Sequence, residues 1–524
     1  MDGQPALGRA PCEETLTVAR NASTRYLAIG IEAALGVLIL PFNVAHLGKA
    51  AYGLWMLTAS VTAYFSVLDL GYAGALVKFV AQYRSRRDAR ALNEILSTAF
   101  YLFAAFGVLT YAAAIGVALS LARLFHLTPD QVQVGRLVLL IVSVNVAAGT
   151  AFSVFGGVVN GFQRYDLNNI VGTISTIVTA GVNVLVLALG YGLVELVAAT
   201  TLVRLLTLAV YRANTYRVFP GLRLRASLVR RERLREMTSF SVYILIIDWA
   251  NKLNYSVDAL VIGVFMNTSA VAVWAVGQRV AELTQRISNQ LNEVLFPTVV
   301  DCDTASRTDR LQTIFIQGTR LSLATVIPMA GPVALMARPL VQAWVGPDFA
   351  GSAIVLQLLA VVVIVRVANA TASTLLKGAG RHRLVAFTNA MTALCNLALS
   401  VAIVTPLGLA GVAFGTLVPV CLASTVVVFP AGCRRVELSV RQAWVQGVWP
   451  AVWPAFVMVL YVSATRSLAG SSLVAVGAEG VTAALVYLLT FLFFGISAAE
   501  RRLYLSKAAE LTTRWRLQMV AEGA

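Results

Sequence analysis

The architecture of the chain follows from a segment that occurs twice, as VVNGFQRYDLNNIVGTISTIVTAGVNVLVLALGYGLVE (Val158–Glu195) and as TLLKGAGRHRLVAFTNAMTALCNLALSVAIVTPLGLAG (Thr374–Gly411). Each copy runs from a turn through an apolar stretch that contains an Asn to a Gly-rich hairpin. The turns share the pattern Gly-x-x-Arg, which is formed by Gly161 and Arg164 and by Gly378 and Arg381. Apolar segments resemble one another by chance, but these copies also occupy matching positions, each at the end of a predicted membrane span.

The composition is that of a polytopic membrane protein. Of 524 residues, 58% are hydrophobic and 13% are charged, and the mean hydropathy is +0.77. Soluble domains are about 45–50% apolar and about 25% charged. Runs of roughly 20 apolar residues recur, each long enough to cross a hydrocarbon core of about 30 Å as a helix. Because the runs are continuously apolar, they predict helices rather than the alternating strands of a barrel.

The hydropathy pattern predicts an all-α fold, a polytopic transmembrane helical bundle of about fourteen spans. Tight Gly or Pro turns separate the helices of 170–211 and of 384–430, so the predicted count is twelve to fourteen. The predicted spans are 25–45, 52–80, 95–120, 132–158, 170–190, 192–211, 239–266, 269–298, 312–337, 353–376, 384–405, 408–430, 444–465 and 472–497.

The repeat recurs after the fourth and the tenth predicted span, so the repeating unit is six helices. An even number of crossings preserves orientation, which predicts parallel repeats related by an axis along the membrane normal. The predicted domains are a cytoplasmic N-terminal segment (1–24), an N-lobe (25–211), a basic cytoplasmic linker (212–238), a C-lobe (239–430), two further spans (431–497) and a cytoplasmic tail (498–524).

Basic residues predict the topology. Most of the 41 Lys and Arg lie in the N-terminal segment, the loops after even-numbered spans and the C-terminal tail, which places both termini in the cytoplasm. The opposite loops carry Lys49, Arg123, Arg338 and Arg466. We attribute the net charge of +16 to this topology and to attraction for anionic membrane lipids, and expect no nucleic-acid partner.

A charged stripe runs along the predicted span 269–298, which contains VWAVGQRVAELTQRISNQLNEVLF. The polar positions recur at increments of three and four, so they share one helical face: Arg279, Glu282, Arg286, Asn289 and Glu293. An ionisable group in a bilayer costs at least about 2.5–3.5 kcal/mol, so this face should point to the bundle interior, a partner or water. The alternative is that each charge belongs to a structural pair, such as Glu282 with Arg286.

Three other spans carry polar residues on one face, which predicts a wet, charged cavity inside the bundle. They are Arg25, Glu32 and Asn43 in span one, Asp248, Lys252 and Tyr255 with Asp258 further along in span seven, and Arg366, Asn369 and Ser373 in span ten. Asp248 and Lys252 have the i, i+4 spacing of a favourable ion pair, so a structural pairing is again the alternative.

Several segments resemble the Wzx-type polysaccharide flippases of the multidrug/oligosaccharidyl-lipid/polysaccharide (MOP) exporter superfamily. The main one is YGLWMLTASVTAYFSVLDLGYAGALVKFVAQY (Tyr52–Tyr83), and the Gly-x-x-Arg turns are similar too. Further matches are SVDALVIGVF around Asp258, the step WAVGQR and the loop Trp344–Pro347. Each is a loose pattern, but their order and spacing cover most of residues 25–430.

This resemblance implies a two-lobed bundle that moves an undecaprenyl-diphosphate-linked oligosaccharide across the bacterial inner membrane by alternating access through a central cationic cavity. Arg279, the basic residue at the family's matching step, would bind the diphosphate together with Arg286, Arg366 and Arg25, while Asn289 contacts the sugars. Glu32, Asp248, Asp258 and Glu282 are candidates for coupling to H⁺ or Na⁺ or for orienting the arginines. We expect no cofactor or metal, and a polysaccharide polymerase and other assembly proteins as candidate partners.

Two other functions remain open at this point. A multidrug or cation exporter of the same superfamily would more typically have an acidic, aromatic-lined cavity. A polysaccharide polymerase or glycosyltransferase would need catalytic side chains in a large extracytoplasmic loop, whereas here these loops are short and carry Asp130 and Asp348 as their acids. We therefore predict a transporter and not an enzyme. The O-antigen, capsule or exopolysaccharide identity of the glycan is not encoded in these patterns.

Overall fold

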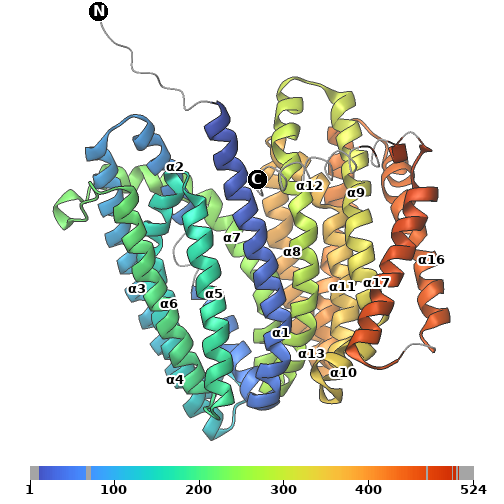
Figure 1. Cartoon of the computed structure of the whole chain (residues 1–524), viewed down its shortest axis with the longest axis horizontal. Coiled ribbons are helices and arrows are strands. Elements are labelled where there is room, and N and C mark those ends of the chain that lie inside the picture. Colours follow the sequence, from blue (N-terminus) through green and yellow to red (C-terminus); the bar gives the residue numbers. More distant parts are fainter. Residues whose placement is uncertain (1–10, 66–71, 468–469, 499, 503–505, 507–524) are drawn as a thin grey trace, which may run out of the picture. The chain divides into compact units, whose positions relative to one another are not determined.

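The computed structural model describes residues 11–65, 72–467, 470–498, 500–502 and 506. The regular structure of these residues is helical, and none of them forms a strand (Figure 1). Nine helices in this part of the chain are long and apolar enough to cross a membrane, and α9 with α10, bent by 74° at their junction, makes a possible tenth. The all-α prediction is confirmed, while the fourteen-span count stays a prediction.

The first compact unit, unit 1, comprises Met1–Ala275. In it, α7 packs against α1, α2 and α3, so the linker predicted at 212–238 lies within unit 1. Its helices are α1 (Pro11–Phe65), α2 (Tyr72–Ser85), α3 (Ala89–Leu124), α4 (Pro129–Gly161), α5 (Tyr165–Ala188), α6 (Leu193–Val218), the short η2 (Ala226–Leu228) and α7 (Arg231–Phe265).

The second unit, unit 2, comprises Val276–Ala524 and begins within α8. In this unit α9 packs against α11 and also against α16 and α17. Its elements are α8 (Thr268–Thr304), α9 (Thr308–Leu335), α10 (Ala337–Val345), η3 (Pro347–Phe349), α11 (Ser352–Ala368), α12 (Ala370–Gly378), α13 (His382–Leu422), η4 (Ala423–Val428), α14 (Phe429–Arg435), α15 (Val440–Ala443), η5 (Trp444–Val448), α16 (Trp449–Thr465), α17 (Leu473–Thr490) and η6 (Phe491–Gly495).

Two of the long helices are interrupted by glycine. Gly48 in α1 has φ +74° and Gly408 in α13 has φ +57°, values that L-residues with a side chain rarely adopt. Gly48 lies between the predicted spans 25–45 and 52–80, and Gly408 is the first residue of the predicted span 408–430, which follows 384–405. Each of these two continuous helices therefore corresponds to two predicted spans, which is one reason why the count of continuous helices is lower than the predicted count of spans.

The two copies of the repeated segment make corresponding contacts, each within its own unit. A side chain at Gly161 would overlap Val80 of α2, and a Cβ at Gly378 would lie 2.8 Å from Val299 of α8. In each copy the glycine of the Gly-x-x-Arg turn thus lets the end of one helix approach another helix closely. The Asn of each copy is buried, with Asn183 6% and Asn396 0% exposed. These contacts support the internal repeat.

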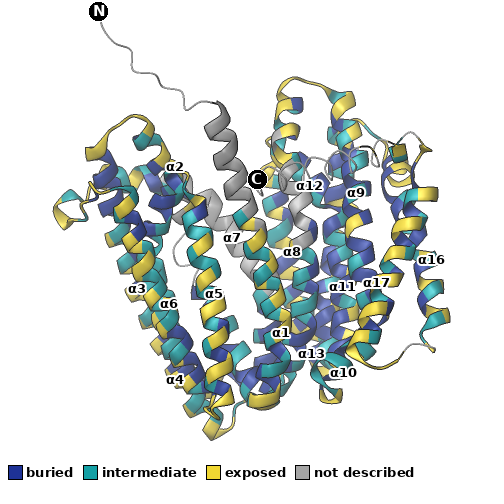
Figure 2. Ribbon diagram, viewed as in Figure 1, coloured by how far each residue is buried: buried dark blue, intermediate teal, exposed yellow. Residues whose placement is uncertain are grey.

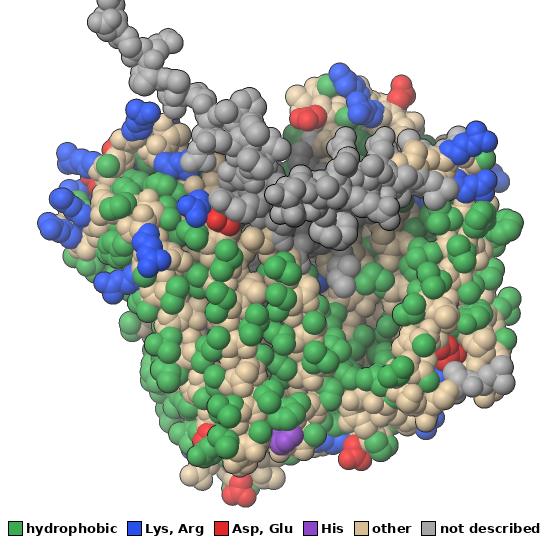
Figure 3. All heavy atoms as spheres, viewed as in Figure 1, with side chains coloured by type: hydrophobic (Ala, Val, Ile, Leu, Met, Phe, Trp, Pro, Cys, Tyr) green, Lys and Arg blue, Asp and Glu red, His purple; other side chains and the backbone are tan. Residues whose placement is uncertain are grey.

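The outward surface of each unit is apolar, as a lipid-facing surface should be. Many helix positions that lie outside the core are large hydrophobic residues, among them Val108 of α3, 72% exposed, and Val474 of α17, 82% exposed. Figure 2 shows exposed positions along helices whose other faces are buried. In Figure 3 hydrophobic side chains cover the middle of each unit, and Lys and Arg gather mostly at one end. The chain is thus a multi-pass membrane protein.

A nearly buried ion pair joins α9 to the residues that follow η6. Arg320, 8% exposed, donates two hydrogen bonds from Nη1 to the Glu500 carboxylate, at 2.9 and 3.0 Å, and one from Nε to the Gln446 carbonyl at 3.2 Å. Burial alone would raise the pKa of the Glu500 carboxyl, but hydrogen bonds from Ser497 and the charge of Arg320 hold it below its usual value. The pair fastens the C-terminal helices to α9.

Replacing Glu500 by Gln should destabilise unit 2 by about 2 kcal/mol, because the guanidinium of Arg320 would stay buried without its counter-charge. The pKa of Glu500 is lower in the folded protein than in the unfolded one, so its stabilisation is present above the unfolded pKa and is lost as the pH falls toward the folded value. Thermal unfolding in detergent at pH 7 and at acidic pH measures both effects. The exposed Asp301→Asn variant is the control, and equal midpoints for the two variants would contradict the prediction.

Candidate functional site

The charged stripe of α8 lies on the side of the helix that faces away from the core of unit 2. Ala281, Thr284 and Ser288 are at most 7% exposed and share one face of α8. Gly277 extends this face, because a Cβ there would lie 3.0 Å from both the Ser352 carbonyl oxygen and the Val355 side chain of α11. At about 100° per residue, the stripe lies on the opposite side of α8, with Arg279 and Glu282 half-buried and Arg286 exposed.

The charges of this stripe interact with one another. Gln278 donates a hydrogen bond from Nε2 to Glu282 Oε1 at 2.8 Å. Arg279 and Arg286 lie close enough to Glu282 for their charges to act on its carboxylate. Glu282 therefore shares one face of α8 with two arginines whose charges it balances in part, while part of each cation stays accessible to an anionic ligand.

Arg366 lies at the depth of the α8 stripe. Near one end of α8, Gly277 faces Ser352 and Val355 of α11, and near the other end Val299 faces Gly378 of α12. The two contacts show that α8 runs in the same direction as α11 and α12. Arg366, half-buried in the last turn of α11, is midway between the contacts, about level with the turn of α8 that holds Arg286.

The junction after Arg366 contains a buried amide. Asn369 separates α11 from α12 and is 8% exposed. Its Nδ2 donates to the Val365 carbonyl at 2.9 Å, whereas its Oδ1 is buried without a hydrogen bond among the described residues. The polar face predicted for span ten therefore lies at a break in the helix. Inside membrane proteins, polar groups at such breaks can bind a ligand.

The polar residues of α1 divide between the surface and the core of unit 1. Arg25 and Glu32 are exposed, so α1 does not bury them in its own unit. Asn43 is 6% exposed, and its Oδ1 makes no hydrogen bond among the described residues. Near Arg25, Thr24 accepts a hydrogen bond at 3.1 Å from Asn169 Nδ2, which ties this end of α1 to α5.

Asp258 is buried in α7 beside a residue that the sequence patterns did not single out. Asp258 is 4% exposed, and its charge acts on the phenol of Tyr64, whose hydroxyl is buried without a hydrogen bond among the described residues. Leu57 of α1 packs on Gly263 of α7, so the two helices are neighbours along this stretch. Tyr64 lies within the stretch Tyr52–Tyr83. A single tyrosine in an apolar run does not indicate that a charged residue of another helix lies nearby.

Two predicted site residues lie outside the described part of the chain. The side chains of Asp248 and Asn289 are not among the described residues, so their positions and the pairing of Asp248 with Lys252 stay predictions. The described candidates fall into two groups. Arg279, Glu282, Arg286 and Arg366 belong to unit 2, whereas Arg25, Glu32 and Asp258 belong to unit 1.

A family model described as "Polysaccharide biosynthesis protein" matches residues 46–354, more than half of the chain. The chain belongs to this polysaccharide biosynthesis protein family. A relative from Haloferax volcanii, described as "Probable flippase AglR", is 21% identical over 418 residues, which are 78% of this chain and 83% of that protein. That relative is itself described as a probable flippase.

Solved structures show the same fold. The lipid II flippase MurJ in an inward closed conformation matches 90% of this chain and 98% of its own, with a TM-score of 0.70 and 12% identity. An inward-facing multidrug resistance MATE transporter of the MOP superfamily matches 78% of this chain and 99% of its own, with a TM-score of 0.60 and 17% identity. The resemblance to Wzx-type flippases of the MOP superfamily is confirmed, and so is the prediction of a transporter and not an enzyme.

Proposed function

We propose that this family member flips an undecaprenyl-diphosphate-linked oligosaccharide, a repeat unit of O-antigen, capsule or exopolysaccharide, across the bacterial inner membrane. The proposed mechanism is alternating access of a central cationic cavity in a bundle of fourteen spans, two six-helix lobes and two C-terminal helices, with both termini in the cytoplasm. The observation that carries the proposal is the position of Arg279 and Arg286, on the side of α8 that faces away from the core of unit 2.

The chemistry of the proposed substrate fits this stripe. A lipid-linked sugar diphosphate has an anionic, hydrated head that cannot enter hydrocarbon and a tail that need not leave it. Guanidinium groups pair with phosphate oxygens in a bidentate manner and keep their charge in a low dielectric. An arginine in a span costs about 2.5–3.5 kcal/mol on insertion scales. A diphosphate that pairs with Arg279, Arg286 and Arg366 would offset this cost. An apolar residue at the same position would carry no such cost, so the arginines are better explained by ligand binding than by packing.

The acidic candidates have a separate proposed role in ion coupling. We assign the coupling H⁺ or Na⁺ to Glu32, Asp248, Asp258 and Glu282. Asp258 is the best-supported of these, because it is 4% exposed and lies close to the buried hydroxyl of Tyr64. A buried carboxylate inside a span is a position at which a transporter can bind a coupling ion.

Flipping in proteoliposomes tests the function. The purified protein is reconstituted with undecaprenyl-diphosphate-linked oligosaccharide, and the share of headgroups that an external sugar-cleaving enzyme can reach is followed over time. We expect fast transfer with the protein and none in empty vesicles, and acceleration by an imposed H⁺ or Na⁺ gradient. Rates equal to those of empty vesicles would refute the flippase proposal. Rates indifferent to both gradients would remove the coupling proposal alone.

A multidrug or cation exporter shares the fold, as the MATE likeness shows. The family match and the two arginines of the α8 stripe, Arg279 and Arg286, both favour an anionic substrate instead. The same proteoliposomes separate the two functions. Gradient-driven uptake of an organic cation without headgroup transfer would support the exporter.

A further inference from the structure

The loop between α6 and α7 is folded against unit 1 with its arginines directed outward. The sequence alternates over Leu222, Arg223, Leu224 and Arg225, and the backbone at Arg225 is extended. Leu222 is 5% exposed and belongs to a core cluster, against which Leu224 also packs. Both arginines of the pattern are exposed. Since successive side chains of an extended segment point to opposite sides, the leucines anchor the loop and the arginines project from it.

Side chains of α3 hold the backbone of this loop. Asn93 donates from Nδ2 to the Gly221 carbonyl at 3.1 Å and accepts from the Arg223 amide at 2.7 Å. Ser97, fully buried, donates to the Arg223 carbonyl at 3.1 Å and accepts from the Arg225 amide at 3.3 Å. The backbone groups of Arg223 and Arg225 are therefore held by hydrogen bonds from α3, while their side chains project outward.

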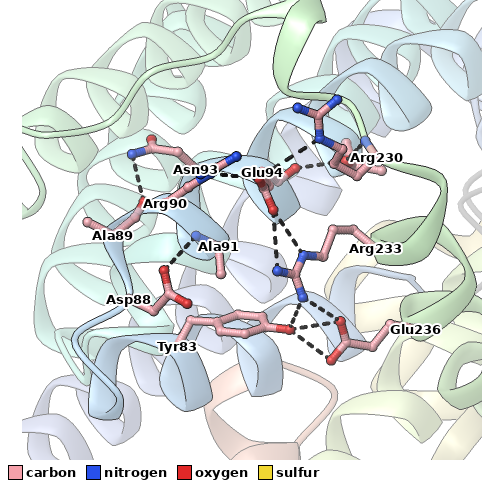
Figure 4. A network of polar contacts seen from close by, with 11 residues as sticks. Tyr83, Asp88, Ala89, Arg90, Ala91, Asn93, Glu94, Arg230, Arg233 and Glu236 are labelled. Atoms are coloured by element: carbon pink, nitrogen blue, oxygen red, sulfur yellow. Dashed lines mark hydrogen bonds and ion pairs between the residues drawn. The ribbon is translucent and has the colours of Figure 1, made fainter.

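The buried carboxylate of Glu94 pairs with other arginines of the region, of which Arg233 is partly buried and Arg90 and Arg230 are exposed. Glu94, 8% exposed, accepts hydrogen bonds from Arg90 Nε at 3.3 Å and from Arg233 Nη2 at 3.3 Å (Figure 4). Arg230 Nε lies 3.9 Å from Glu94, and the Arg230 amide donates to Thr98 at 3.1 Å. Glu94 thereby compensates positive charge at the start of α7.

The same network continues to α2 and closes around the start of α7. Arg233 Nη1 donates to the Tyr83 hydroxyl at 2.7 Å, and that hydroxyl donates to the Glu236 carboxylate at 2.8 and 2.9 Å (Figure 4). Burial, and then the hydrogen bond to Glu236, raise the pKa of the Tyr83 hydroxyl, so it stays protonated at neutral pH. Both glutamates are thus occupied within the network rather than with the outward arginines.

We propose that the outward arginines form a docking surface for the headgroups of anionic phospholipids, the linker shelf, in the leaflet next to the linker, which is the cytoplasmic one in the proposed topology. The shelf consists of Arg223, Arg225 and Arg231, all exposed, with Arg217 at the end of α6. Exposed acids of the same region are Asp88 and Glu232, so positive charge is in excess. A leaflet that carries anionic lipid is the partner that complements it.

The depth of the shelf favours lipid over a soluble partner. On α6, Leu206 is 60% and Val210 46% exposed, as expected of residues in contact with acyl chains. Arg217 follows Val210 by seven residues, about 10 Å along the helix, which is enough to reach from the hydrocarbon core into the headgroup layer. In Figure 3 basic side chains gather at the end of unit 1 directly beyond its hydrophobic surface. In the proposed topology, lipid headgroup phosphates lie at the level of the linker shelf.

Lipid selection by the full-length protein tests the shelf. The protein is purified in detergent with equal amounts of phosphatidylglycerol and phosphatidylethanolamine, and native mass spectrometry measures the ratio in which the two lipids stay bound. We expect phosphatidylglycerol to be enriched, and each Arg→Gln change at Arg223, Arg225 or Arg231 to lower the enrichment about fivefold. The matched control removes three exposed charges from unit 2, at Arg307, Arg310 and Arg383.

A second variant tests whether lipid binding depends on the conformation of the loop or only on its charge. Ser97→Ala keeps every arginine but removes two hydrogen bonds that hold the loop, so it should lower the enrichment about twofold to fivefold. Absence of enrichment, equal loss in the control triple variant, or an unchanged ratio in Ser97→Ala would each overturn the proposal. Competition by millimolar inorganic phosphate would overturn it as well, because it would identify a free-anion site. None of these outcomes depends on whether the protein flips oligosaccharide.

Discussion

Replacing Arg279 or Arg286 by Gln is expected to lower the rate of headgroup flipping about 100-fold while the protein stays folded. Each change removes a cation from the side of α8 that faces away from the core of unit 2, so it opens no cavity in that unit. It also leaves Glu282 with one guanidinium neighbour instead of two. A diphosphate would lose a charge-assisted bidentate contact. The proteoliposome assay gives the rate, and thermal unfolding in detergent reports the fold.

Two sets of variants make this prediction specific. Arg279→Lys keeps the charge but not the planar pair of donors, so its rate should lie between those of the wild type and of Arg279→Gln. Arg307→Gln and Arg383→Gln remove exposed arginines of unit 2 outside the candidate site and should flip at the wild-type rate. If all these variants lose activity to the same extent, the loss reflects general charge and not a site on α8.

Replacing Gly53 by Ala is expected to destabilise unit 1 by about 3 kcal/mol or more. A Cβ at Gly53 would overlap the backbone carbonyl oxygen of Thr268 and would also lie 3.2 Å from the Ala272 amide nitrogen. Backbone atoms cannot turn away as a side chain can, so α1 would have to move away from the start of α8. A lower midpoint of thermal unfolding and a lower yield of folded protein in detergent measure the effect.

Gly116→Ala is the matched control for this change. Gly116 lies within α3 of the same unit, is exposed, and has no atom within 4 Å of where its Cβ would be. Alanine should therefore leave stability unchanged or raise it by up to about 1 kcal/mol, because it favours the helix over the unfolded chain. Equal midpoints for the Gly53 and Gly116 variants would show that α1 and α8 do not approach as closely as the structure has them.

The repeated pattern and the apolar runs were sufficient to predict much of the fold. A span of about 20 apolar residues has no alternative to a helix in lipid, because its backbone groups must bond internally. Spacings of three and four residues likewise placed Arg279, Glu282 and Arg286 on one face of α8, since helical geometry is local. The turns at Gly161 and Gly378 were recognisable for the same reason. These are properties of neighbouring residues, and the sequence alone determines them.

Contacts between distant residues were decided by the tertiary structure. The proximity of Asp258 to Tyr64, the ion pair of Arg320 with Glu500 and the hydrogen bonds of the linker to Asn93 each involve segments far apart in the chain. The hydropathy of one apolar helix does not determine which other helix packs against it, because many pairings bury a similar apolar area. The sequence therefore determined which faces are polar and which segments repeat, whereas packing decided which of those polar groups meet.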